Sequence, residues 1–342
     1  VQWWKTQLHG APEIITLPLD RPRPAVMQYR GQSRCVNLPA TLVDSVKSVA
    51  RAQDCTPYMV MLGAFAVLLQ RYTGTMDEAD LVIGTTTANR PRPELEGLIG
   101  LFINMLALRV RVDPLQSGAQ LLALTKTVCL NANAHQAVAF EQVVEALNPS
   151  RSLSHSPVFQ VTFDVQNAPE TTLQLEQLVL HPIEAKVTAS KFDLGLSIES
   201  HAEGELARWT WNPDLFDELT IERLAQQYLQ LLTELTVHPG QPVGRLAIID
   251  RDQRQSLLQA QQVAQSSQLE ACWLARFEQQ VQIHGDSPAA SDTHGTVTYN
   301  ELRQRARALA SELQSLGVSH EDMVCVLLDR GVHLLGSLLA VQ

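Results

Sequence analysis

Cysteines are few in this sequence, and nothing in their spacing joins them. Their number is odd, they lie far apart, and none forms a CxxC pair or has a histidine at zinc-ligand spacing. This excludes a disulfide framework and a zinc site built on them. We expect each to be a small, buried, apolar residue in a chain that resides in a reducing cytoplasm. The cysteines are Cys35, Cys55, Cys129, Cys272 and Cys325.

Long apolar runs and basic clusters are also missing. No window approaches the roughly 18 consecutive apolar residues that a membrane span needs, and the N-terminus lacks a signal-peptide pattern. The formal net charge is −10, and the Lys and Arg residues are scattered, whereas nucleic acids are bound by clustered cations. We therefore expect neither a membrane nor a nucleic acid as a partner.

Several catalytic motifs have no counterpart here. The sequence contains no adjacent histidines, no GxSxG, no HExxH and no GxxxxGK[ST] spacing. Gly331 and Gly336 therefore do not form a phosphate loop. The chain by itself is expected to hold no metal and to bind neither ATP nor an amino acid.

The length of 342 residues and the hydrophobic content of 45% predict about two globular domains, from a prior of roughly 150 residues each. A stretch rich in Gln and Ser, residues 250–268, is typical of a linker with some helical tendency. The sequence begins with Val1 and ends at Gln342 within an apolar run, so we expect a piece of a longer chain.

Helical and strand periods alternate before this linker. An amphipathic helix is predicted at 41–53, and Thr56-Pro57 supplies a cap and a first-turn proline for a second helix that is apolar nearly all round. Strands are predicted at 80–85 and 159–165. The pattern therefore predicts a domain of mixed α/β type.

A hairpin is predicted from two further strands, 191–199 and 205–211, joined at Gly204. Asp193 falls on the polar side of the first strand. We expect it to be exposed or paired with Lys191, two residues away.

Residues 97–112 are the most informative stretch. Gly97 and Gly100 suggest a loop whose backbone passes close to another group. Residues 105–112 then alternate between apolar side chains and a second set that includes Arg109 and Arg111, which predicts a half-buried strand.

Beyond the linker, Val297 to Leu302 begins a long helix that ends at Gly317. Met323 to Leu328 is a continuous apolar run, which favours a strand buried on both faces of an α/β sheet. A last helix is predicted from Val332 to Val341.

Several motifs in the same order resemble the condensation domains of nonribosomal peptide synthetases. Residues 12–24, with Leu17-Pro18-Leu19-Asp20-Arg21-Pro22-Arg23-Pro24, are similar to the "LPTDRPRP" connector between the two lobes of that domain. Residues 97–110 are similar to its "GxFVNT…R" signature, and residues 135–141 to "HQDxPFE", with Ala137 and Ala139 as departures. Residues 151–169 resemble "RDLSxxPLFQVxFxLQNAP", and residues 297–342 resemble the beginning of an adenylation domain.

The resemblance implies a division of the chain. Residues 1–24 would be the inter-lobe helix end and Pro-rich connector, and 25–249 the C-terminal lobe of a condensation domain. Residues 250–268 would be the linker, and 269–342 the N-terminal portion of an adenylation domain. The implied fold is an α/β sandwich lobe like that of chloramphenicol acetyltransferase, with a mixed sheet and helices, followed by part of an α/β adenylate-forming domain.

The resemblance also implies a chemistry. Condensation domains join carrier-bound aminoacyl or peptidyl thioesters through a peptide bond, in a tunnel between two lobes. The family's HHxxxDG motif is absent and is expected upstream of Val1, so no catalytic residue is assigned within the chain. The residues that match motifs would shape the substrate tunnel: Gly100, Phe102, Asn104, Arg109, His135, Gln136, Phe140 and Glu141.

The implied partners are peptidyl carrier domains on both sides, the N-terminal lobe of the condensation domain and the rest of the adenylation domain. Phosphopantetheine would be carried by those partners and not attached here. ATP and Mg²⁺ would serve only a complete adenylation domain.

Three alternatives stay open. An epimerization or a cyclization relative would share this lobe, and a non-catalytic lobe that docks carrier domains would have the same sequence features. The subtype is also open. "RSLSHSPVFQVTFDVQNAP" and "KFDL" favour the subtype that joins two L-residues, whereas "GLFIN" also occurs in the subtype that accepts a D-residue donor.

Overall fold

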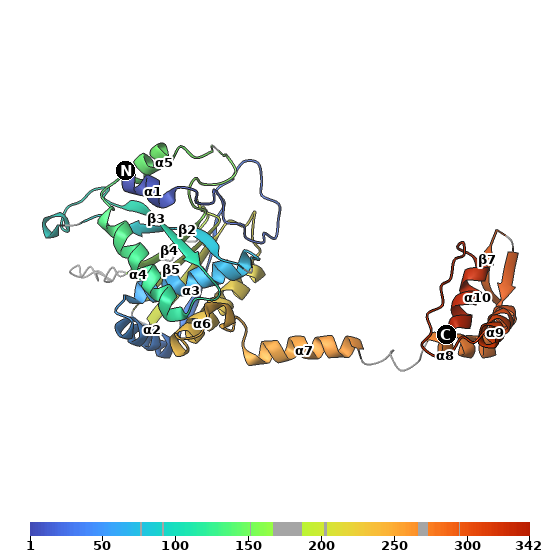
Figure 1. Ribbon diagram of the computed structural model, residues 1–342. Helices are drawn as coiled ribbons and strands as arrows, with labels where there is room; N and C mark the ends of the chain where they lie inside the picture. The colour runs from blue at the N-terminus through green and yellow to red at the C-terminus, as the bar shows by residue number, and fades with distance from the viewer. Residues whose placement is uncertain are drawn as a thin grey trace, which may run out of the picture. The chain divides into compact units, whose positions relative to one another are not determined.

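The computed structural model describes residues 1–75, 77–90, 92–150, 152–166, 187–201, 204–265, 273–293 and 295–342. The chain divides into two compact units, residues 1–250 and 251–342. The first unit carries a mixed sheet covered by helices (Figure 1). The α/β class predicted from the sequence is therefore confirmed.

Among the described residues of the first unit, six strands form one sheet, in the order β1-β6-β5-β4-β2-β3. The pairs β2/β4 and β4/β5 are parallel, and the other neighbouring pairs are antiparallel. The predicted hairpin is β5 paired with β6, closed by His201 opposite Gly204. The strands are β1 (Gln32–Leu38), β2 (Ala79–Thr87), β3 (Asn104–Val112), β4 (Val161–Gln166), β5 (Leu194–His201) and β6 (Gly204–Trp211).

Four helices lie together over one face of this sheet (Figure 1). The central one is α3, which packs against α2, α4, α6 and three strands and is therefore buried nearly all round, as predicted. Its Thr56 hydroxyl accepts a hydrogen bond from the Met59 N–H (3.3 Å), which confirms the predicted cap. The helices are α2 (Ala40–Ala52), α3 (Pro57–Tyr72), α4 (Gly118–Ala134) and α6 (Glu218–Val237).

Aromatic side chains fill the space between α3, α6 and the sheet. The Phe65 ring lies 5.6 Å from Phe163, 6.0 Å from Trp209 and 6.3 Å from Tyr228, between ring centroids. All four side chains are fully buried. Because these side chains come from α3, β4, β6 and α6, this cluster joins the helical layer to the middle of the sheet.

The opposite face of β4, β5 and β6 carries polar and small residues. Leu194, Leu196 and Ile198 of β5 lie in the core, whereas Gly195 and Ser197 alternate with them on the other side. We call this side the open face. Its residues are Thr162, Asp164, Gly195, Ser197, Arg208 and Thr210.

Helices α1 (Gln2–Leu8) and α5 (Phe140–Leu147) pack against each other beside β3 (Figure 1). Strand β3 is consequently not half-buried as the alternation predicted. Both Ala107 and Arg109, on its expected outer face, are buried. The prediction was wrong because an edge strand gains a second cover from segments distant in sequence, which alternation along one strand does not reveal.

The Pro-rich connector forms no helix, as its prolines predicted, and charged residues hold it. Asp20 accepts hydrogen bonds from Asp217 N (2.8 Å) and Thr220 Oγ1 (3.0 Å) at the start of α6. Arg23 forms a two-point ion pair with Asp193, with distances of 3.0 and 2.5 Å. Asp193 is only 4% exposed, so the expected exposed position and Lys191 partner were wrong.

The second unit contains a two-stranded hairpin and packed helices. Its small core comprises Val297, Leu302, Ala306, Val332 and Leu339. The long helix and the last helix were predicted correctly. The elements are α7 (Arg251–Gln265), α8 (Trp273–His284), β7 (Pro288–Asp292), β8 (Gly295–Thr298), α9 (Tyr299–Ser315) and α10 (Val332–Val341).

Residues 323–328 do not form the buried strand that was predicted. These residues form no strand, and Met323 and Leu327 are almost fully exposed. A strand buried on both faces needs neighbouring strands and covering helices. Among the described residues of this unit, the only paired strands are β7 and β8, and they pair with each other.

Cysteine burial also differs from the prediction. Cys35 and Cys325 are exposed, while Cys55 and Cys129 are partly buried, and Cys272 lies outside the described residues. Cys35 lies on edge strand β1 and Cys325 in the unpaired 323–328 segment.

No single helix among the described residues is long and apolar enough to cross a membrane. Helices α2 and α3 reach that length and composition only as a pair bent by 105°. Helix α3 is buried between the sheet and the other helices of the first unit.

Candidate functional site

Asn104, the first residue of β3, holds the turn between α4 and α5. Its Nδ2 donates hydrogen bonds to the carbonyl oxygens of Gln136 (2.8 Å) and Val138 (2.7 Å). Its Oδ1 accepts a hydrogen bond from the backbone N–H of Phe140 (3.0 Å), at the start of α5. The side chain is 9% exposed. Three bonds from one buried amide fix the backbone of residues 136–140 against the sheet.

Gln136 extends this arrangement to the neighbouring strand. Its Oε1 accepts a hydrogen bond from Thr87 Oγ1 (2.6 Å), and Thr87 is the β2 residue paired with Asn104. The Phe140 ring lies 5.1 Å from that of Phe159, between centroids. The structure therefore brings Asn104, Gln136 and Phe140 together.

His135 follows the last residue of α4 and is fixed on several sides. Its ring stacks on Trp3 with centroids 4.1 Å apart and planes 4° from parallel. Its Nδ1–H donates to the carbonyl of Asn131 (2.8 Å), and its own carbonyl accepts from Trp4 Nε1 (3.2 Å). These contacts attach α1 to the end of α4, so the imidazole stabilises the packing of these two helices.

Gly100 and Phe102 lie in the exposed loop before β3. The Arg90 guanidinium lies 4.3 Å from the centroid of the Phe102 ring and also donates to loop carbonyls, including Glu96 (2.9 Å) and Leu98 (2.7 Å). Nothing lies within 4 Å of a Cβ built on Gly97, and a Cβ on Gly100 meets only Phe102. The predicted close approach of the backbone to another group is therefore found at Gly100, where that Cβ would lie 3.0 Å from the Phe102 ring, and not at Gly97.

Arg109 and Glu141 lie apart from this arrangement. Arg109 forms a two-point ion pair with Asp80, with a shortest distance of 2.6 Å, and donates to the carbonyls of Gln7 (3.0 Å) and His9 (2.8 Å). The Asp80 carboxylate raises the pKa of the guanidinium further above its ordinary value. Arg109 thus fastens the end of α1 to the sheet. Glu141 is exposed in the first turn of α5.

A cavity of about 710 Å³ lies over the open face, beside the end of β2. None of the eight predicted tunnel residues lines it, although Thr87 and Ile103, which do, adjoin the Asn104 arrangement. Sequence reasoning missed its polar residues, yet the alternation of polar and apolar positions along β4 was the available signal. Its polar side chains are Thr86, Thr87, Thr162, Asp164, Gln166, Ser190, Lys191, Ser197 and Thr210.

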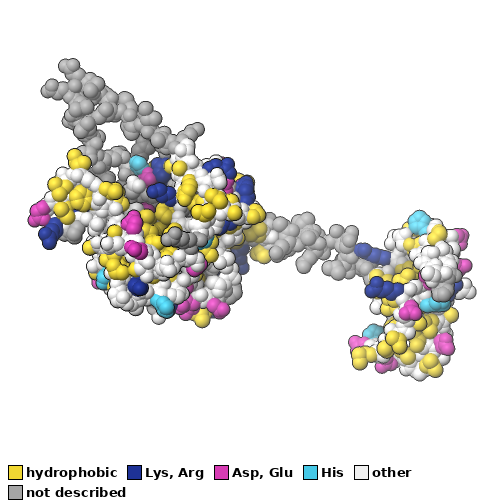
Figure 2. Space-filling model, turned by 90° about the horizontal axis from the view of Figure 1, so that it is seen from above, with side chains coloured by type: hydrophobic (Ala, Val, Ile, Leu, Met, Phe, Trp, Pro, Cys, Tyr) yellow, Lys and Arg dark blue, Asp and Glu magenta, His cyan; other side chains and the backbone are white. Residues whose placement is uncertain are grey.

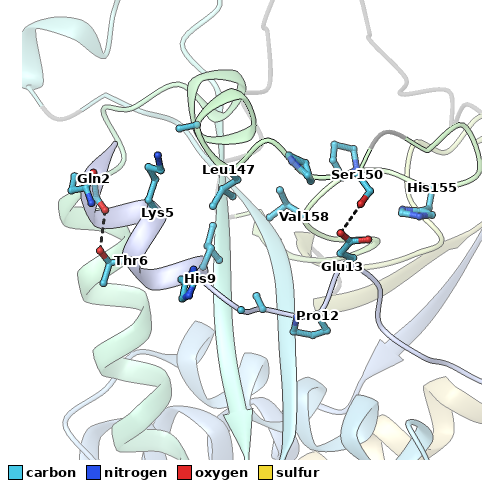
Figure 3. A pocket seen from close by; sticks show the side chains of 16 residues that line it. Gln2, Lys5, Thr6, His9, Pro12, Glu13, Leu147, Ser150, His155 and Val158 are labelled. Carbon is cyan, nitrogen blue, oxygen red and sulfur yellow. Dashed lines mark hydrogen bonds between the residues drawn. The ribbon is translucent and has the colours of Figure 1, made fainter.

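A second cavity, of about 550 Å³, lies between the end of α1 and the segment after α5 (Figure 3). Lys5, His9 and His155 line it together with Glu13, whose Oε1 accepts a hydrogen bond from Ser150 Oγ (2.8 Å). Within the described parts of the chain, no group of three or more His, Cys, Asp or Glu residues could hold a metal ion.

The second unit does not fit a nucleotide phosphate at the start of α10. There the N–H of Val332 donates to Asp292 Oδ2 (2.9 Å), and a Cβ on Gly331 would lie 2.8 Å from the same oxygen. A phosphate at a helix N-terminus needs those N–H groups and no competing anion. A carboxylate already takes this place.

The family comparison agrees with this architecture. The condensation-domain family model matches residues 1–258, and the model for AMP-binding enzymes matches residues 277–342. The chain belongs to the condensation-domain family. The family resemblance seen in the sequence motifs is thus confirmed, and so is the order of its two parts.

The curated relatives of this condensation-domain chain include two synthetases. It is 36% identical to malpinin synthetase of Mortierella alpina, covering 99% of this chain and 4% of that protein. It is also 36% identical to phosphinothricin tripeptide synthetase of Streptomyces viridochromogenes, covering 96% of this chain and 30% of that protein. The chain therefore spans less than a third of either relative.

Solved structures show the same fold. A four-domain nonribosomal peptide synthetase bound to AMP and glycine matches with a TM-score of 0.81 and 26% identity, over 99% of this chain and 27% of that one. The X-domain from teicoplanin biosynthesis matches with a TM-score of 0.64 and 27% identity, over 72% of this chain and 56% of that one. The predicted sandwich fold of the lobe is confirmed.

Proposed function

We propose that this chain is part of a modular nonribosomal peptide synthetase and contributes one lobe of a condensation domain together with the start of an adenylation domain. The observation that carries this proposal is the order of the parts. Relatives of this class align with both matched regions in sequence, over 96% to 99% of the chain. The reaction is formation of a peptide bond between carrier-bound thioesters.

In this proposal the open face forms one wall of the substrate passage, and the cavity over it is part of that passage. Figure 2 shows the surface of the first unit from above. In the reaction, an amine nitrogen bonds to the carbonyl carbon of a thioester, the C–S bond breaks, and the carrier thiol is released. Bond formation needs the two reactants held in line. Thr162, Ser197 and Thr210 supply hydroxyl groups that can orient amide and thioester oxygens in this space.

Seven of the eight motif residues have supporting roles in this proposal. Asn104, His135, Gln136 and Phe140 build the edge beside the cavity, since Gln136 bonds Thr87, which lines it. The loop with Gly100 and Phe102 exposes Ile99 and Leu101 almost completely, and we assign this apolar surface to contact with a partner lobe. Arg109 secures α1. No contact supports a specific role for Glu141.

The proposed partners follow from this chemistry. Carrier domains on either side would deliver substrates on phosphopantetheine arms, and a partner lobe with HHxxxDG would supply the histidine that manages the amine proton. This assignment fits a chain that contains no adjacent histidines of its own. ATP and Mg²⁺ are assigned in this proposal to the complete adenylation domain only, and within the second unit the start of α10 does not fit a phosphate. The proposed compartment is the cytoplasm.

A reconstitution tests the proposal. The chain is joined to a histidine-bearing N-terminal lobe from a relative, and carrier domains loaded with an aminoacyl donor and acceptor are added. Mass spectrometry then looks for the dipeptidyl thioester. The control replaces the second histidine of the partner lobe by alanine, which should abolish the product.

The same assay separates the alternatives. A donor residue with inverted configuration and no new amide would indicate an epimerization relative, and a product that has lost a further water would indicate a cyclization relative. Capture of carrier domains without any turnover would reduce the chain to a docking lobe.

A further inference from the structure

Asp164 on β4 lines the open-face cavity, and only one of its two carboxylate oxygens accepts hydrogen bonds from described residues. Its Oδ1 accepts three hydrogen bonds from β2, donated by Thr85 Oγ1 (3.3 Å), Thr86 N (2.7 Å) and Thr86 Oγ1 (2.7 Å). Its Oδ2 has no hydrogen bond or ion pair with any residue that the structure describes. Strand β2 therefore holds the carboxylate in one orientation and leaves one oxygen available.

Two other carboxylates, on or next to the neighbouring strand β5, are already paired with cations. Glu199 accepts from Arg208 Nε (2.8 Å), and Asp193 pairs with Arg23. Lys191 also lines the cavity but forms no ion pair with Asp164 among the described contacts. A negative charge that lacks a cation partner, beside hydroxyl groups in a cavity large enough for an aminoacyl group, is suited to binding an ammonium.

We propose that Asp164 binds the protonated amine of an aminoacyl substrate and orients it in the open-face cavity. The proposal rests on the proposed function of that cavity. Its Oδ2 would accept one ammonium N–H, while hydroxyl oxygens of Thr162 and Ser197 are available for the others. Asp164 is a positioning residue here, since it holds the ammonium form and takes no part in bond making. The ammonium belongs either to the α-amine or to a basic side chain.

The test measures binding of three pantetheine amides to the full chain by calorimetry at about millimolar ligand. Alanyl-aminopantetheine carries an α-ammonium, its N-acetyl derivative carries no cation, and Nα-acetyl-lysyl-aminopantetheine carries only a side-chain ammonium. Asp164→Asn keeps an oxygen that can accept from Thr86 but removes the charge. Asp44→Asn is the matched control, because Asp44 is an exposed carboxylate on α2.

We expect at least one ammonium ligand to bind about tenfold more tightly than the N-acetyl ligand, as one charge-assisted hydrogen bond supplies. That preference should vanish in Asp164→Asn, persist in Asp44→Asn and return in Asp164→Glu. The ammonium ligand that shows it identifies the source of the amine. A change in fold alone would weaken all three ligands equally and would not alter the preference.

Two results overturn the inference in distinguishable ways. If wild-type protein binds all three ligands with equal affinity, Asp164 does not recognise an ammonium, although the cavity keeps its proposed role. If wild-type protein binds none of them, the open-face cavity is not a substrate passage, and both the inference and that part of the proposed function fail.

Discussion

Replacing Asn104 by alanine should destabilise the first unit without touching any group that performs chemistry. The change removes three hydrogen bonds from a side chain that is 9% exposed and leaves the N–H of Phe140 and two carbonyl oxygens without this partner. Each such bond contributes about 1 kcal/mol net, and unpaired buried groups add to the loss. We expect the free energy of unfolding to fall by about 2 to 4 kcal/mol, which lowers Tm by roughly 5 to 15 °C for a unit of this size.

Urea unfolding followed by tryptophan fluorescence measures this loss. Four of the five tryptophans, Trp3, Trp4, Trp209 and Trp211, lie in the first unit, so the main transition reports that unit. Asn104→Asp should cost at least as much as Asn104→Ala, because it places a carboxylate oxygen where Nδ2 faces two carbonyl oxygens.

The control is Asn133→Ala on α4, an exposed position where the expected change is within about 0.5 kcal/mol. The reasoning is refuted if Asn104→Ala unfolds like this control while the reconstituted condensation assay loses its product. Asn104 would then act on the substrate, and its hydrogen bonds to residues 136–140 would be incidental to stability.

Three further predictions concern the stability of two ion pairs, the binding of ATP and the reactivity of two cysteine thiols. Arg23→Ala should cost about 3 to 5 kcal/mol, because it leaves the buried Asp193 carboxylate unpaired. Lys126→Ala breaks an exposed pair with Asp54 and should change stability far less in the same urea assay. Isothermal titration of the chain with ATP should show no tight binding, since a carboxylate occupies the start of α10, and a micromolar Kd (about −8 kcal/mol) would contradict this. Burial raises the pKa of the Cys129 thiol to about 12, so its reactive thiolate is scarce at pH 8 and increases about tenfold for each pH unit up to that pKa. Mass spectrometry after iodoacetamide should therefore find exposed Cys325 modified first, and equal labelling of both at pH 8 would count against the burial of Cys129.

Elements whose causes are local were predictable from the sequence. The helix α3 begins where Thr56-Pro57 places a cap and a fixed φ angle, and both signals lie within a few residues of the helix. The β5/β6 hairpin likewise follows from two alternating segments and one glycine. In such cases the residues that decide the structure are neighbours in sequence.

Interactions between distant segments were not predictable. Arg23 and Asp193 are separated by 170 positions, and no periodicity in either segment indicates the other. Arg109 is buried in a strand that alternation predicts to be half exposed. Its charge is accommodated there by the ion pair with Asp80 and by hydrogen bonds to the end of α1. The failure at 323–328 has the same origin, because a run of apolar residues becomes a buried strand only when other strands flank it.

The site shows the same division more sharply. Asn104, His135 and Arg109 carry the family resemblance, and each holds one segment of the chain against another. Thr162 and Asp164, which line the open-face cavity, fall at the unspecified positions of the "FQVxFxLQN" pattern. Residues that hold the fold can thus identify the family, while the family pattern leaves the cavity-facing positions 162 and 164 unspecified. Substrate preference should therefore be sought in the second set, and Asp164 is the position from which to begin.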